Sequence, residues 1–243
     1  EFKGWGGAKL CVALSQGTPW LLTVRADLKA RRGDVDALRG LRLTAAEGPD
    51  LVFIQMLRSA GLDPERDLEI VELPGAKERD VSFGVFAAEA LSEGKIDGFW
   101  ANAMGAETVV SSGLGKIHID VRRGDDPDEV RLFTFAGLVT TDDFIAREPD
   151  AVDAAVRAIV KVQKALRADP ALAREVGRRK FPPESAALIA TIIERDAPFY
   201  DPVISEAAIR RLNAFAQSIG HLTGPVPYEQ VVATRCRPLW TGD

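Results

Sequence analysis

The residues best suited to bind a small molecule follow a short apolar segment near the middle of the chain. Residues 96–100 have the length and the aromatic and branched composition of a buried strand. Trp100 ends this segment, and Asn102 and Met104 follow it. Ligands of open α/β sheets lie at the carboxyl ends of strands, where an indole face and an amide suit a planar, hydrogen-bonding solute. The structural alternative is that Trp100 belongs to the core and Asn102 only caps the next helix.

A second candidate site is the turn that contains Glu47 and Gly48. It joins an expected strand over residues 41–45 to a helix that begins at Pro49. Backbone N–H groups at a helix N-terminus favour a carboxylate, sulfonate or phosphate. Glu47 adds a negative charge and Pro49 removes a donor, so a cationic or neutral solute fits equally well. An ordinary strand-to-helix turn is the structural alternative.

A third candidate is the polar turn over residues 15–19, between two expected strands. Gln16 and Thr18 could form hydrogen bonds to a solute, and Trp20 could stack on its ring. A structural turn with Trp20 in the core explains the same residues equally well.

The sequence offers no recognisable set of catalytic or metal-binding residues. Its only histidines are His118 and His221, and its only cysteines, Cys11 and Cys236, do not form a CxxC motif. We therefore expect no metal, no cofactor and no catalytic residue. The two cysteines lie near opposite ends of the chain, and this separation leaves open whether they form a disulfide.

Composition and charge exclude several classes of protein. The 243 residues carry a net charge of −5, and the basic residues are scattered, which argues against nucleic acid or an anionic membrane surface as a partner. No apolar run approaches the ~20 residues that a membrane-spanning helix needs. The chain opens at Glu1 with neither an initiating Met nor a signal peptide, so we expect a mature form or a fragment.

Strand and helix patterns alternate through the middle of the chain, whereas residues from 150 onward are almost entirely helical. Such alternation predicts an α/β protein with a mainly parallel sheet covered on both faces. We expect two lobes with a ligand cleft between them. The first lobe would comprise residues 1–36 and 132–243, including the helical C-terminal portion, and the second would be the α/β lobe of residues 37–131.

Several passages in order resemble a known family. They include TPWLLTVRADL, VDALRGLRLTAAEGPD, ALSEGKIDGFWAN and FAGLVTTDDFIAREPDAVDAAVRAIVKVQKAL. The chain resembles the periplasmic solute-binding proteins of the sulfonate, nitrate, taurine and thiamine-pyrimidine type. These are the substrate-binding components of ABC transporters and have the two-lobed type II periplasmic binding fold. In that family a Gly-x-Ile-Asp element, here residues 94–97, precedes a strand whose end faces the cleft.

The resemblance implies an extracytoplasmic binding protein and not an enzyme. Such a protein captures a small organic solute, aromatic or anionic, by hinge closure and delivers it to a membrane permease and ATPase. Its location would be periplasmic after removal of a signal peptide. Family members carry a further β-α-β-α portion at the start of the first lobe, so this lobe is expected to be incomplete here.

Two other functions stay open. One is an enzyme on the same fold that acts on a small aromatic or pyrimidine-like compound, with Glu47 or His118 as its base. The other is an incomplete or sensory domain that binds a partner chain, which a large exposed apolar patch on the first lobe would support.

Overall fold

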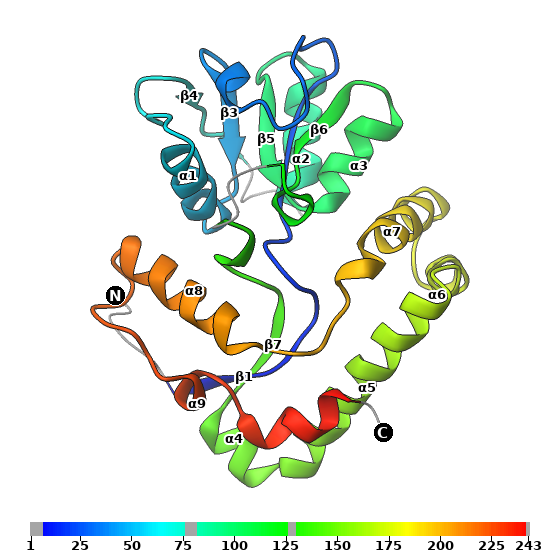
Figure 1. Ribbon diagram of the computed structural model, residues 1–243. Helices are drawn as coiled ribbons and strands as arrows, with labels where there is room; N and C mark the ends of the chain where they lie inside the picture. The colour runs from blue at the N-terminus through cyan, green and yellow to red at the C-terminus, as the bar shows by residue number, and fades with distance from the viewer. Residues whose placement is uncertain (1–6, 76–81, 126–129, 242–243) are drawn as a thin grey trace. The chain divides into compact units, whose positions relative to one another are not determined.

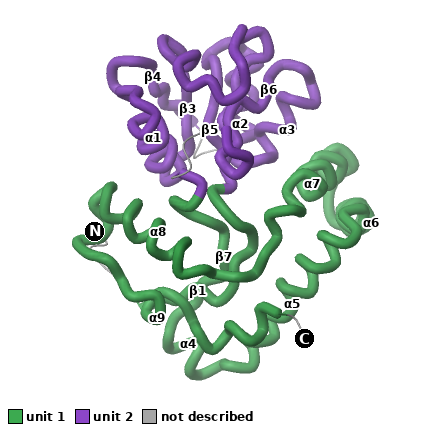
Figure 2. The backbone as a smooth tube through the Cα atoms, in the orientation of Figure 1, with its two compact units in different colours: residues 1–18, 132–243 green, residues 19–131 purple. Residues whose placement is uncertain are grey.

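The computed structural model describes residues 7–75, 82–125 and 130–241, which form two compact units. Unit 1 comprises residues 1–18 and 132–243, and unit 2 comprises residues 19–131 (Figure 2). The sequence-based division assigned residues 19–36 to the first lobe. The structure groups them with unit 2, because the strand Leu21–Arg25 pairs with two other strands of that unit.

Unit 2 is built on a five-stranded sheet with the order β4-β3-β5-β2-β6. Strand β3 runs parallel to β4 and β5, whereas β2 is antiparallel to both β5 and β6. The sheet is therefore mixed, although the sequence predicted a mainly parallel one. Its strands are β2 (Leu21–Arg25), β3 (Arg42–Ala45), β4 (Glu69–Ile70), β5 (Gly98–Ala101) and β6 (Gly115–Ile119).

Helices cover both faces of this sheet (Figure 1). They are α1 (Pro49–Ser59), α2 (Phe83–Ser92) and α3 (Ala103–Ser111). Because side chains alternate along a strand, β5 contributes to both layers. Phe99 and Ala101 pack in one cluster with α2 and with Val109 of α3, whereas Trp100 stacks on Phe53 of α1. The expected two-sided covering of the sheet is confirmed at this central strand.

Two glycines allow α2 and α3 to pack closely. A Cβ atom at Gly105 would lie 2.2 Å from the carbonyl oxygen of Gly84, and one at Gly84 would lie 2.6 Å from Asn102 Oδ1. Contacts this short exclude any side chain at Gly105 unless the helices separate. The first turns of α2 and α3 are thereby held side by side.

Among the described residues of unit 1, two strands form an antiparallel sheet, β1 (Ala8–Ala13) with β7 (Gly137–Thr141), and helices make up most of the rest. Its α-helices are α4 (Asp142–Arg147), α5 (Pro149–Ala168), α6 (Leu172–Lys180), α7 (Pro183–Asp196), α8 (Glu206–Ser218) and α9 (Tyr228–Val231). The described residues also form the 3-10 helices Val35–Leu38, Val121–Arg123 and Val130–Leu132, with Ala197–Phe199 and Thr234–Trp240 in unit 1.

The core of unit 1 joins β1 to α5 and to the C-terminal segment. Val156 and Val160 of α5 pack in one cluster with residues 10–13 of β1 and with Trp240. Gln163 on the same helix is buried, and its Nε2 donates to the carbonyl oxygens of residues 13 and 14. The long amphipathic helix predicted from the sequence is therefore the element that supports this small sheet.

Candidate functional site

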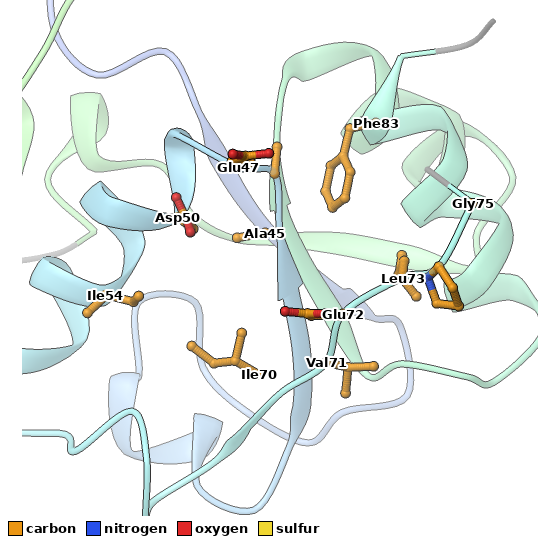
Figure 3. A pocket seen from close by; sticks show the side chains of 12 residues that line it. Ala45, Glu47, Asp50, Ile54, Ile70, Val71, Glu72, Leu73, Gly75 and Phe83 are labelled. Carbon is orange, nitrogen blue, oxygen red and sulfur yellow. The ribbon is translucent and has the colours of Figure 1, made fainter. Parts of the chain in front are cut away.

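Unit 2 contains a pocket of about 670 Å³ at the carboxyl ends of β3 and β4. Its walls come from the β3–α1 turn, the first turns of α1, the segment after β4 and Phe83 at the start of α2 (Figure 3). This position fits the general rule that ligands of α/β sheets lie beyond the carboxyl ends of the strands. The volume lies in the range of small-molecule sites.

The β3–α1 turn has its geometry because Gly48 adopts φ 93° and ψ −65°. A side chain would be strained at this positive φ, so the turn requires glycine. Asp50 then closes the turn, because its Oδ1 accepts hydrogen bonds from the backbone N–H groups of Gly48 and Leu51, both at 2.8 Å. The N–H of Asp50 itself donates to the carbonyl oxygen of Ala46 at 2.9 Å.

These hydrogen bonds bear on the expectation of an anion at this helix N-terminus. An anion would need the N–H groups and the positive end of the helix dipole. The N–H groups of Gly48 and Leu51 already point to the Asp50 carboxylate. The negative charge of this carboxylate also offsets the positive end of the helix dipole. The turn is therefore a self-capped helix start and a poor site for a second negative charge.

The pocket combines acidic and apolar side chains. Glu47, Asp50 and Glu72 contribute carboxylates, and the described lining residues include no Lys or Arg. Ile54, Ile70 and Phe83 are among the apolar side chains, and Figure 3 shows Glu47 and Phe83 from different elements at this pocket. Such a lining suits a molecule with an apolar body and with hydrogen-bond donors or a positive charge.

Several of the candidates from the sequence lie along one edge of the unit 2 sheet. Ala45 of β3 pairs with Trp100 of β5, and Ala101 of β5 pairs with Leu21 of β2. The residues just beyond these pairs belong to the same sheet edge. They are Trp20, Glu47 and Gly48, and Asn102.

At this edge the structural alternative for Asn102 is realised. Its Oδ1 accepts a hydrogen bond from the N–H of Gly105 at 3.3 Å, which makes it the N-cap of α3. Met104 lies half-buried in the first turn of the same helix. The side chain of Asn102 is exposed, so capping leaves its amide NH₂ group accessible.

Trp100 lies in the core of unit 2. It is fully buried, and its ring stacks on Phe53 with 5.7 Å between centroids and 20° between planes. The expectation that Trp100 and Asn102 share a face requires β5 to continue, but the strand ends at Ala101. We therefore do not carry Trp100 forward as a ligand contact.

Gln16 and Thr18 belong to unit 1, where both side chains have partners in the protein. Gln16 Nε2 donates to the carbonyl oxygens of Asp201 and Val203 at 2.9 and 2.8 Å. Thr18 is fully buried, and its Oγ1 donates to the carbonyl oxygen of Thr134 at 3.5 Å. Both residues hold loops of unit 1 in place.

The two candidate bases of the enzyme hypothesis do not meet. Glu47 lines the pocket, whereas His118 is buried on β6, with β5 and β2 between it and β3. His118 Nε2 lies 2.8 Å from the carbonyl oxygen of Asp34. Within residues 7–75, 82–125 and 130–241, no group of three or more His, Cys, Asp or Glu side chains could hold a metal ion.

Sequence reasoning missed the part of the pocket that follows β4. Ile70, Val71 and Leu73 line it, together with Phe83 from α2. The signal was present in the sequence, because Pro74 and Gly75 end a segment over residues 68–73 that has the composition of a strand. Only the parallel pairing of β4 with β3 brings that strand end to Glu47.

Known proteins provide an independent comparison. The model of the NMT1-like family matches residues 30–179 of the chain. Among curated proteins, none shows significant similarity to it.

Solved structures share the fold at low sequence identity. A protein assigned as the periplasmic sulfonate-binding protein SsuA of a Methylobacillus flagellatus ABC transporter is 21% identical, with a TM-score of 0.63 over 95% of this chain and 68% of its own. The aliphatic sulphonate-binding protein SsuA from Escherichia coli is 12% identical, with a TM-score of 0.67 over 95% of this chain and 75% of its own. The desulfurization enzyme DszB is 16% identical, with a TM-score of 0.58 over 97% of this chain and 80% of its own.

These comparisons confirm the resemblance and the fold class predicted from the sequence. The chain has the α/β architecture of type II periplasmic binding proteins. The similar structures include periplasmic binding proteins, one of them assigned to a sulfonate ABC transporter, but an enzyme shares the fold as well. Fold alone does not decide between binding and catalysis.

Proposed function

Since the chain belongs to the NMT1-like family, we propose that it is the extracytoplasmic solute-binding component of an ABC transporter. The pocket at the carboxyl ends of β3 and β4 would hold the solute. The observation that carries this proposal is the placement of that pocket, because it lies where an α/β sheet binds its ligand. The similar structures that bind sulfonates for import support the same role.

The solute that fits this pocket is a small organic molecule with a flat or apolar body and with donors or a positive charge. Phe83, Ile54 and Ile70 would contact the body, and Glu47 would accept from an amine or ring N–H. A sulfonate or nitrate, which similar structures bind, fits less well, because the helix donors already serve Asp50. This revises the aromatic or anionic solute expected from the sequence towards an aromatic, cationic or neutral one.

Closure of the two units on the solute and docking on a transporter are also part of this proposal. The solute would drive closure of the two units about the two chain connections, at residues 18–19 and 131–132. The closed form would then dock on a membrane permease with its ATPase. Among the described residues, no helix is long and apolar enough to cross a membrane.

The second candidate function is an enzyme, because DszB shares the fold. The pocket supports it less well. A general base needs a polarising partner and a reacting atom within hydrogen-bond reach. His118 cannot partner Glu47, because it lies on β6 and its ring nitrogen contacts the carbonyl oxygen of Asp34. Turnover of any bound compound that is lost in Glu47→Gln, with binding retained, would favour the enzyme.

Thermal-shift measurements test the proposed function. We would screen aminopyrimidines and other aromatic amines against sulfonates, aromatic acids and nitrate. A ligand at a hundred times its Kd adds about 2.7 kcal/mol of stability, which raises the Tm of a protein of this size by roughly 5–10 °C. We expect such a shift from the amine-bearing aromatic class.

Variants locate the bound compound. Glu47→Gln and Phe83→Ala should each reduce the shift by at least half at fixed ligand concentration. The matched controls are Glu65→Gln, an exposed carboxylate of the same unit outside the pocket, and Phe144→Ala, an exposed ring of unit 1. Equal shifts in all four variants would contradict this pocket, and shifts from anions alone would contradict the proposed solute class.

A further inference from the structure

The only two cysteines of the chain meet in the core of unit 1. Cys11 lies on β1, and Cys236 lies in the 3-10 helix Thr234–Trp240 near the C-terminus. Both are fully buried as free thiols in the same apolar cluster, and each thiol shifts the pKa of the other. Chain segments from opposite ends of the sequence thus bring their cysteines into one cluster.

Backbone contacts hold this pair in place from both sides. The N–H of Ala233 donates to the carbonyl oxygen of Leu10 at 2.9 Å, and Leu10 forms a parallel bridge with Val232. Trp240 Nε1 donates to the carbonyl oxygen of Cys11, also at 2.9 Å. The C-terminal segment is therefore bonded to β1 on both sides of Cys236. The Cα atoms of Cys11 and Cys236 cannot separate unless these hydrogen bonds break.

A third element also fixes the C-terminal segment. Arg235, the neighbour of Cys236, forms an ion pair of 2.8 Å with Asp153 of α5. The segment is therefore tied to α5 as well as to β1. Three parts of unit 1 converge at the cysteine pair.

The environment makes the two thiols unequal. Interaction with the Cys11 thiol lowers the pKa of Cys236, and the Arg235 guanidinium acts in the same direction. The same interaction, together with burial, raises the pKa of Cys11. A thiolate is the nucleophile in thiol–disulfide exchange.

We propose that Cys11 and Cys236 form a structural disulfide when the protein folds in the presence of a small-molecule or protein disulfide as oxidant. One cysteine, as its thiolate, attacks one sulfur of the oxidant and releases the other half of the oxidant as a thiolate. The second cysteine then loses its proton to that thiolate and attacks the sulfur of the first cysteine in the mixed disulfide. The new S–S bond forms, the second half of the oxidant leaves, and the oxidant is reduced by two electrons to two thiols.

This disulfide would stabilise unit 1, the unit with the smaller sheet. It would close the chain into a ring from residue 11 to residue 236, which encloses all of unit 2. A ring of this size restricts the unfolded chain strongly, and this restriction is the main source of disulfide stabilisation in the chain-entropy description. The inference does not depend on the solute or on transport.

The test compares the full chain refolded from denaturant with oxidised glutathione and with dithiothreitol. Oxidative refolding should give a monomer about 2 Da lighter with no thiol that reacts in denaturant, whereas the reduced protein should show two. The oxidised form should melt roughly 5–15 °C higher. The double variant Cys11→Ala/Cys236→Ala should have one Tm under both conditions.

Other results would overturn the inference. Two reactive thiols after oxidative refolding would show that the pair stays reduced, and disulfide-linked dimers would show that the cysteines pair between chains. A monomer with the lower mass but an unchanged Tm would show a bond that does not secure the fold. Each of these readings is available from the wild-type chain, so none depends on a variant that folds.

Discussion

The two units differ in how completely each buries its apolar side chains. Unit 2 packs helices on both faces of a five-stranded sheet, whereas unit 1 has a two-stranded sheet for a similar number of residues. Among the described residues, eight of the ten exposed large hydrophobic side chains lie in unit 1 and two in unit 2. Unit 2 has helices on both faces of its sheet, and unit 1 exposes more of its large apolar side chains to solvent.

Side chains at the sequence-predicted sites serve different purposes in the two units. In unit 2 the buried residues build a rigid sheet, and the loops at its carboxyl edge are left to form the pocket. In unit 1 the polar candidates of the sequence, Gln16 and Thr18, hold loops of a sparser core.

The largest effect should come from the core of unit 2. Phe53→Ala removes the ring that stacks on Trp100 and leaves a cavity, so we expect a loss of about 4 kcal/mol. The matched change in unit 1 is Phe181→Ala, at a ring that is 49% exposed, and it should cost less than about 0.5 kcal/mol. Urea denaturation measures both, and similar losses would break the comparison.

The next effect concerns the close contact of α2 and α3. Gly105→Ala places a methyl group against the backbone of Gly84 and forces the helices apart, at a cost of about 2–3 kcal/mol. Gly224→Ala in unit 1 is the control, because a Cβ there meets no atom within 4 Å. Thermal unfolding of both variants checks this, and a neutral Gly105→Ala would show that unit 2 is packed less tightly than described.

A smaller effect should appear as a pH dependence of unit 2. Hydrogen bonds from Arg42, whose Nε lies 3.0 Å from Asp97 Oδ2, lower the pKa of Asp97. A carboxyl whose folded pKa is lowered stabilises the protein above its unfolded pKa of about 3.9, and this contribution is lost as the pH falls through the folded value.

Asp97→Asn should therefore destabilise the protein by about 1 kcal/mol at pH 7 and by progressively less below pH ~4. The control is Asp27→Asn, at a side chain that is 77% exposed. Urea midpoints at pH 7 and pH 3 give the comparison. A difference between wild type and Asp97→Asn that stays constant with pH would contradict the assignment.

The smallest effect should come from the open face of unit 1. Val162 on α5 is 55% exposed, so Val162→Thr should change the stability by less than about 0.5 kcal/mol. Val156→Thr, on the buried side of the same helix, should cost about 1–2 kcal/mol because its hydroxyl loses water. Equal costs at the two positions would mean that the face around Val162 is covered in solution.

The sequence predicted the local elements well where the signal is local. Gly94 and Asn102 mark the boundaries around β5, and Pro49 marks the start of α1. Gly-x-Ile-Asp and the neighbouring passages were sufficient to identify the family.

Pairing between distant segments was harder to predict. Nothing within residues 19–36 shows that β2 joins the sheet of unit 2 in an antiparallel direction. For the same reason, the sequence predicted only part of the pocket lining. Glu47 and Gly48 follow from a strand-to-helix turn, but Ile70 and Phe83 reach the pocket through the pairing of β4 and the packing of α2.

Whether Trp100 faces the core or a ligand depended on where its strand ends. An aromatic residue at a strand end serves the core or a ligand according to which layer it faces, and α1 supplies Phe53 to cover it. The contact between Cys11 and Cys236 is likewise a product of the tertiary fold.

Isothermal titration calorimetry of wild type and Glu47→Gln tests most directly whether the unit 2 pocket binds a small amine-bearing aromatic solute, as we propose. We expect one site per chain for a compound identified in the thermal-shift screen, and at least tenfold weaker binding in Glu47→Gln, which corresponds to a loss of about 1.4 kcal/mol. Equal affinity in the two proteins, or binding of a sulfonate but of no amine-bearing aromatic compound by the wild type, would contradict the account.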